Sequence, residues 1–68
     1  MKIRDLAPYI YEKSYVYYEK TSPEDYLAIE YIDVFVGFLK DAPNEILEKE
    51  VASIGAKRKG ILDIRVNV

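Results

Sequence analysis

The sequence predicts an α+β domain in which a four-stranded, mainly antiparallel sheet carries two short helices on one face. Three observations support this class: helical apolar spacing near the N-terminus, two segments rich in tyrosine, valine and isoleucine, and strict alternation of apolar and polar residues over 62–68. The expected order is helix, strand, strand, helix, strand, strand (αββαββ). A length of 68 residues is enough for a single domain, 1–68.

The first helix is expected from about Arg4 to Tyr11. Pro8 limits its length, because a proline beyond the first turn removes a backbone hydrogen bond and crowds the preceding turn. The apolar residues at positions i, i+3, i+4 and i+7, which share one helical face, are Ile3, Leu6, Ala7 and Ile10.

The first hairpin is expected to pair a strand over Ser14–Lys20 with one over Tyr26–Leu39, joined by the turn-forming residues 21–25. The apolar phase changes within the second strand, which indicates a β-bulge or a break near Asp33. One face is expected to hold Leu27, Ile29 and Tyr31, and the other Val34, Val36 and Phe38.

The second helix is expected from about Pro43 to Lys49, with Asp41 as its cap. Two further strands, Val51–Lys57 and Ile61–Val68, should form a hairpin around residues 58–60. Gly60 would supply the positive φ of that turn.

The chain contains no histidine and no cysteine, and its three glycines are far apart. Histidine-dependent nucleophilic catalysis, the common zinc sites and phosphate-cradling glycine loops are therefore excluded. Carboxylate pairs such as Glu30 with Asp33, or Glu48 with Glu50, could act as acid and base, but acids in these settings are usually solvated. We expect a non-enzymatic protein without cofactor or metal. The absence of a signal-like or membrane-spanning apolar run predicts a cytoplasmic location.

All seven tyrosines lie within the first 31 residues. In the structural interpretation they are ordinary strand residues whose rings cover apolar surface while their hydroxyl groups stay in water. In the functional interpretation they form a protein-binding face, because tyrosine is enriched at binding hot spots, and the neighbouring acids would make that face suit a basic partner protein. The candidate residues are Tyr15, Tyr17, Tyr18, Glu19, Glu24 and Asp25.

A basic turn gives the alternative hypothesis, a small nucleic-acid-binding sheet protein. Consecutive basic residues at a hairpin tip can reach phosphates, although charges in an exposed turn also keep a hairpin soluble. The candidate residues are Lys57, Arg58, Lys59 and Arg65.

Two stretches of the chain resemble small proteins encoded by phages and other mobile elements of Gram-positive bacteria. They are Met1-Lys2-Ile3-Arg4-Asp5-Leu6 through Tyr9-Ile10, and Gly37 through Lys40-Asp41-Ala42-Pro43 and Glu45-Ile46-Leu47 to Glu50-Val51. Some small proteins of such elements are anti-CRISPR proteins, which bind and block a nuclease effector. The resemblance thus implies an inhibitor of a CRISPR effector nuclease.

Self-association is a further expectation. Residues 26–39 look apolar on both faces, and open sheet edges in a small domain favour pairing with a second copy. We therefore expect a homodimer.

Overall fold

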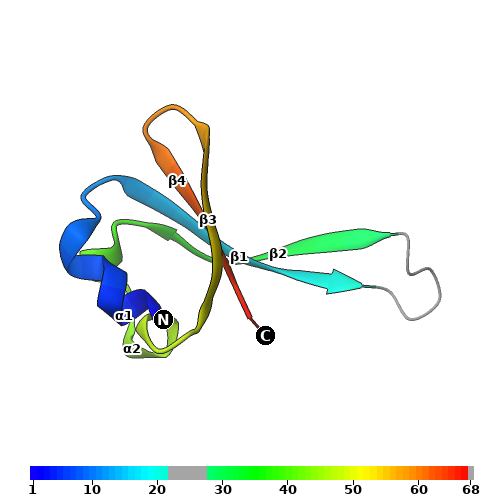
Figure 1. The fold of residues 1–68 in the computed structure, drawn as a ribbon, viewed down its shortest axis with the longest axis horizontal. Helices are drawn as coiled ribbons and strands as arrows, with labels where there is room; N and C mark the ends of the chain where they lie inside the picture. Colours follow the sequence, from blue (N-terminus) through cyan, green and yellow to red (C-terminus); the bar gives the residue numbers. More distant parts are fainter. Residues whose placement is uncertain (22–27, 68) are drawn as a thin grey trace.

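The computed structural model describes residues 1–21 and 28–67, the side chains of 57 and 58 excepted. Along the chain the elements are α1 (Ile3–Leu6), η1 (Ala7–Tyr9), β1 (Lys13–Thr21), β2 (Ile29–Gly37), η2 (Leu39–Asp41), α2 (Asn44–Leu47), β3 (Val51–Arg58) and β4 (Ile61–Val66). The two α-helices lie side by side near the N-terminus, and the β1–β2 hairpin projects away from them (Figure 1). This confirms an α+β domain with a four-stranded sheet.

The sheet has the strand order β2-β1-β4-β3 and is mixed. Both hairpins, β1–β2 and β3–β4, are antiparallel, but β1 and β4 at the centre are parallel. The expectation of a mainly antiparallel sheet is therefore wrong. Strands β1 and β4 lie side by side because this pairing buries apolar side chains of both. Val16 on β1 is level with Ile64 on β4, and both side chains are fully buried.

A β-bulge interrupts β2, as the change of apolar phase predicts. Val16 is paired with Phe35 and Tyr17 with Asp33, which leaves Val34 as the extra residue. Both Val34 and Phe35 pack against the core.

The bulge corrects the predicted faces of β2. Val36 does not share the face of Val34, because it pairs with Tyr15 and is 51% exposed. Ile29 and Tyr31 are also exposed. The face of β2 that carries Ile29, Tyr31 and Val36 is therefore not covered by the described residues of the chain.

The core lies between the short helices and one face of the sheet. Ile3 of α1, Leu39 of η2 and Ile46 of α2 pack there against the central strands. The sheet contributes Val16, Ile64 and Val66. These helices are too short to be stable alone, so this packing holds them in place.

Proline sets the limits of both helices. The predicted helix over 4–11 is divided into α1 and η1, with Pro8 inside the 3₁₀ turn. The second helix begins after Pro43, which occupies the N-cap position, so the prediction that Asp41 caps it is wrong: Asp41 ends η2. Gly60 has a φ of 76°, as the predicted turn requires.

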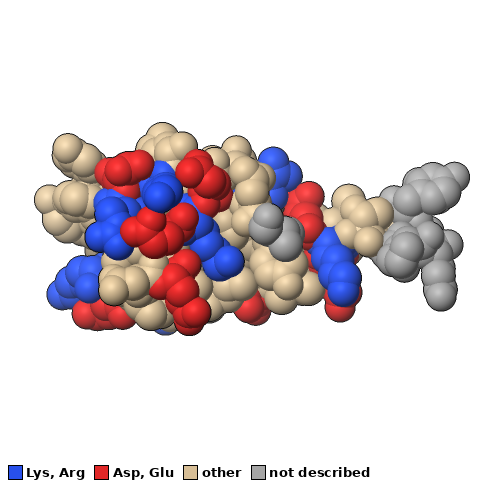
Figure 2. Space-filling model, turned by 90° about the horizontal axis from the view of Figure 1, so that it is seen from below, with Lys and Arg blue, Asp and Glu red and all other residues tan. Residues whose placement is uncertain are grey.

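Glu48 joins the N-terminal segment to the end of α2. Its carboxylate accepts hydrogen bonds from Lys2 Nζ at 2.8 Å and from Arg4 Nε at 2.7 Å. The α-amino group of Met1 pairs in the same way with Glu50 at 3.0 Å. Figure 2 shows the face seen from below, where lysine and arginine side chains are interleaved with acidic ones.

The Lys2 and Arg4 hydrogen bonds lower the pKa of Glu48, and the hydrogen bond to Glu48 raises the pKa of Lys2. Glu48 is therefore held as a carboxylate, the form that accepts hydrogen bonds.

In the described part of the chain, no helix has the length and apolar character needed to cross a membrane.

Candidate protein-binding face

The sheet face opposite the core carries a row of side chains from three neighbouring strands. Residues at paired positions project on the same side of a sheet. Tyr17 of β1 is level with Asp33 of β2 and Arg65 of β4. We call this surface, made of Tyr15, Tyr17, Glu19, Tyr31, Asp33 and Arg65, the open tyrosine face.

Aromatic contacts organise the open tyrosine face. The ring centroids of Tyr15 and Tyr17 are 6.0 Å apart, and those of Tyr17 and Tyr31 are 5.8 Å apart in an edge-to-face arrangement. The Tyr15 hydroxyl group donates a hydrogen bond to the Asp33 carboxylate. Tyr31 remains 58% exposed. Such packing orients the rings in advance, which reduces the entropy that binding would cost.

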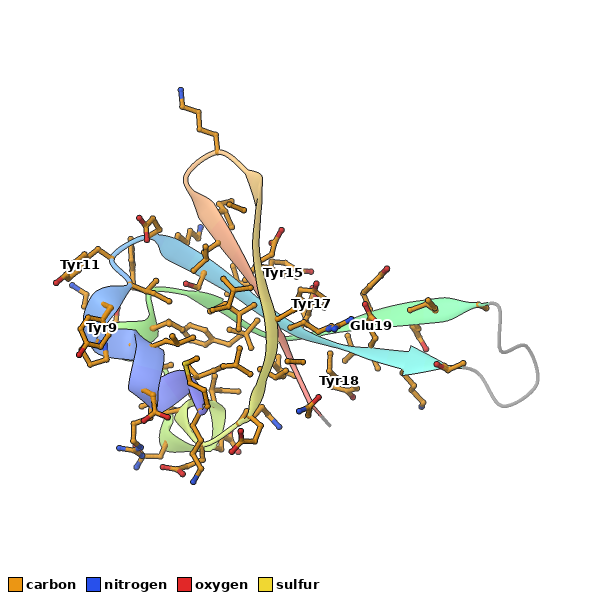
Figure 3. All side chains as sticks on the ribbon, in the orientation of Figure 1. Tyr9, Tyr11, Tyr15, Tyr17, Tyr18 and Glu19 are labelled. Atoms are coloured by element: carbon orange, nitrogen blue, oxygen red, sulfur yellow. The ribbon has the colours of Figure 1, made fainter. Side chains whose placement is uncertain are left out.

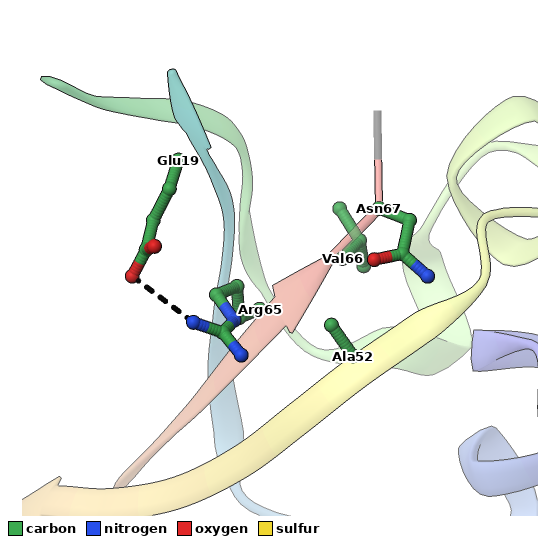
Figure 4. Close-up of a pocket in the computed structure, with 5 residues that line it drawn as sticks. All are labelled: Glu19, Ala52, Arg65, Val66 and Asn67. Carbon is green, nitrogen blue, oxygen red and sulfur yellow. Dashed lines mark hydrogen bonds and ion pairs between the residues drawn. The ribbon is translucent and has the colours of Figure 1, made fainter. Parts of the chain in front are cut away.

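An ion pair completes this face. Arg65 Nη1 donates to Glu19 Oε1 at 3.2 Å, with both side chains about one-third exposed (Figure 4). A small cleft of about 190 Å³ lies beside the pair and is lined by Glu19, Ala52, Arg65, Val66 and Asn67. The cleft therefore offers charged and amide groups that could bond to a partner.

The structure brings together some of the residues expected in a protein-binding site. Tyr15, Tyr17 and Glu19 lie on the open tyrosine face, as labelled in Figure 3. Tyr18 does not: it alternates to the other side of β1 and packs against the core. Alternation along a strand makes this unavoidable, since Tyr17 and Tyr18 are adjacent in sequence. Glu24 and Asp25 lie outside the described residues.

The residues of the nucleic-acid hypothesis are placed differently. Arg65 forms its ion pair with Glu19, so its charge is already compensated. Lys59 is exposed in the turn that precedes β4, whereas Arg65 lies near the far end of that strand. The side chains of Lys57 and Arg58 are outside the description. The described residues thus form no continuous basic surface that includes Arg65.

Strand pairing adds residues to the face that sequence reasoning did not place there. Tyr31 and Asp33 of β2 were not among the residues predicted for the protein-binding face, although Tyr31 was expected on one face of that strand and Asp33 near its bulge. Asp63, which is buried, is level with Tyr15. The alternation along β2 was visible in the sequence, but its register against β1 was not.

The comparisons with known proteins add no relative: no family model matches the chain, and neither a curated protein nor a solved structure matches it. Within residues 1–21 and 28–67, no group of three or more acidic side chains is arranged to hold a metal ion. What the open tyrosine face offers chemically is ring surface, hydroxyl groups and charged hydrogen-bonding groups.

Proposed function

We propose that this protein is a non-enzymatic binding protein that uses the open tyrosine face to dock on a partner protein. One observation carries the proposal: on an uncovered sheet face the ring of Tyr17 contacts that of Tyr15 on one strand and that of Tyr31 on the next, and Tyr31 is 58% exposed. Tyrosine supplies large contact area with few rotatable bonds and a hydroxyl group that can bond to a partner.

The charge of the face favours a basic partner. Among the six residues of the open tyrosine face, Glu19 and Asp33 are acidic and Arg65 is basic. Complementary charges speed the encounter of two proteins and select the correct partner more than they add affinity. The hydrogen-bonded groups would exchange some of these bonds for bonds to the partner.

The resemblance to phage proteins directs the proposal to one partner class. We propose a stoichiometric inhibitor of phage or prophage type that acts in the cytoplasm of the host cell by blocking a CRISPR effector nuclease. Nucleic acid is the less favoured partner, because Arg65 is engaged by Glu19.

The test is a DNA-cleavage assay with purified CRISPR effector complexes and increasing amounts of the protein. We expect cleavage to stop when the protein is about equimolar with the effector complex. We expect cleavage to continue when the Tyr31→Ser variant is added instead. Tyr9→Ser is the matched control: Tyr9 is 78% exposed, lies beside the helices and away from Tyr17 and Glu19 (Figure 3), and should be dispensable.

Two outcomes would count against this function. Unimpaired cleavage by every effector type at excess protein would remove the inhibitor assignment. If the variant with both Tyr31→Ser and Tyr17→Ser still inhibits, the open tyrosine face is not the binding surface, whatever the partner.

We also propose a homodimer formed through β2. This strand is at the edge of the sheet and has exposed apolar side chains at Ile29, Tyr31 and Val36. Light scattering at micromolar concentration tests it, and a monomer mass would contradict it.

A further inference from the structure

A second hollow lies between the turns η1 and η2, among elements that do not form the open tyrosine face. Its volume is about 400 Å³, roughly twice that of the cleft beside Arg65. Its lining is apolar or aromatic except for one lysine, and consists of Ala7, Pro8, Ile10, Tyr11, Phe38 and Lys40. We call it the η1–η2 groove. Its size falls in the range of pockets that hold ligands or a partner's anchoring side chains.

Aromatic side chains of the groove are left in contact with water. Tyr11 is 82% exposed and Phe38 is 45% exposed, although both would be more stable with their rings buried. Exposed aromatic groups gathered around a hollow are typical of binding sites, whereas single exposed apolar residues are common on any surface. The groove is therefore a candidate docking site.

Lys40 gives the groove a positive charge. Its ammonium group lies 5.9 Å from the centroid of the Phe38 ring, close enough for a cation–π contact. No carboxylate of the described residues pairs with it, in contrast to Lys2, Arg4 and Arg65, which are each paired with a glutamate. A carboxylate from outside the chain would complement this cation.

A second copy of the chain fits the groove poorly. A two-fold contact through this surface would bring the same patch of both copies together, and the lining of that patch contains Lys40 but no carboxylate to pair with it. Like charges in such a contact are destabilising. A single cation is also too little for nucleic acid, whose binding depends on several phosphate contacts.

We propose that the η1–η2 groove binds an acidic, apolar peptide segment of a partner protein. An aromatic or large aliphatic side chain would enter between Tyr11 and Phe38, and an adjacent carboxylate would pair with Lys40. This surface is separate from the open tyrosine face, so it can hold even if the function proposed above does not.

The absence of tryptophan from this protein permits a direct binding measurement, because the emission of a tryptophan-containing peptide then reports only on the peptide. The probes are a blocked tetrapeptide, glutamate-leucine-tryptophan-glutamate, and its match with both glutamates replaced by glutamine. We expect the acidic peptide to bind about two- to fivefold more tightly at low salt, the range of one exposed ion pair. Added salt should reduce that preference.

Two matched pairs of variants locate the binding. Lys40→Glu should reverse the preference for the acidic peptide, whereas Lys20→Glu, the same charge change on an exposed residue of β1, should not. Tyr11→Ser should weaken both peptides severalfold. Tyr9→Ser, at a residue equally exposed but outside the lining, should leave both unchanged.

Several results would overturn the proposal. Equal binding of the two peptides would show that Lys40 does not recognise a carboxylate. No binding of either peptide at millimolar concentration would show that the groove is not a peptide-binding site. A dimer in light scattering that Tyr11→Ser converts to a monomer would assign the groove to a second copy instead. Amide shifts in nuclear magnetic resonance spectra that map to Tyr17 rather than to η1 and η2 would move the peptide to the other face.

Discussion

Arg65 of β4 and Glu19 of β1 form an ion pair with 3.2 Å between Nη1 and Oε1, although 46 positions separate them in the chain. The contact exists because β1 and β4 run parallel and adjacent at the centre of the sheet, with Arg65 level with Tyr17. It joins one residue of the predicted protein-binding site to one of the predicted nucleic-acid site. Each of these residues therefore limits what the other can bind.

We expect the Glu19–Arg65 pair to contribute about 0.2 to 1 kcal/mol to stability, the range of partly exposed ion pairs. A double-mutant cycle with Glu19→Gln and Arg65→Gln, followed by urea unfolding, measures the coupling. The same cycle with Lys20→Gln in place of Glu19→Gln is the control and should give none. A coupling energy of zero for Glu19 and Arg65 would mean that the contact is only geometric.

Glu48→Gln tests the ion pairs at the N-terminal segment by their pH dependence. The pKa of Glu48 is lowered in the folded protein, so its stabilising effect is fully present above its ordinary value of 4.5. That effect disappears as pH falls from 4.5 through the lower folded value. Glu48→Gln should therefore be less stable than the natural protein at pH 7 and equally stable at strongly acidic pH.

The lysine side of the same interaction has the opposite sign. The pKa of Lys2 is raised above 10.5, so its contribution is present below that value and is lost as pH rises through the folded value. Unfolding curves recorded from acidic to alkaline pH measure both effects, the loss at low pH through Glu48 and the loss at high pH through Lys2. Glu12→Gln is the control, because Glu12 lies outside these ion pairs. A difference between the natural protein and Glu48→Gln that stays constant with pH would contradict the electrostatic origin.

Ile64 and Ile54 are paired across β4 and β3, but Ile64 is fully buried and Ile54 is 45% exposed. Removing one methyl group from each compares burial at nearly the same place in the sheet. Ile64→Val should lower the free energy of unfolding by about 0.5 to 1.5 kcal/mol. Ile54→Val should change it by less than about 0.5 kcal/mol. Equal losses in chemical denaturation would contradict the difference in burial between the two side chains.

Glycines of the second hairpin should respond to alanine in opposite directions. Gly60 has a φ of 76° in the turn, so Gly60→Ala should cost about 1 to 2 kcal/mol through backbone strain. Gly55 has no positive φ, and a Cβ there would meet no atom within 4 Å. Gly55→Ala should therefore stabilise by about 0.5 to 1 kcal/mol, because alanine loses less conformational freedom on folding. Thermal unfolding of both variants distinguishes the two cases.

Local features of the fold could be predicted because they depend on residues close together in sequence. Pro8 limits the first helix, Gly60 forms the turn, and the change of apolar phase near Asp33 indicates the bulge. The face of Val36 was mispredicted because a bulge near Asp33 can lie at one of several residues, and only pairing with β1 places it at Val34. The prediction that Asp41 caps the second helix was wrong for a similar reason, because Asp41 belongs to the 3₁₀ turn η2.

The sequence by itself determined the α+β class, the number of strands and the enrichment of tyrosine before residue 32, because periodicity and composition are properties of the chain alone. Only the tertiary structure decided that β4 lies beside β1. That pairing brings Arg65 to Glu19 and places Val16 level with Ile64 in the core. The physical reason is that strand order follows from which apolar faces can be buried together, and this depends on contacts between residues far apart in sequence.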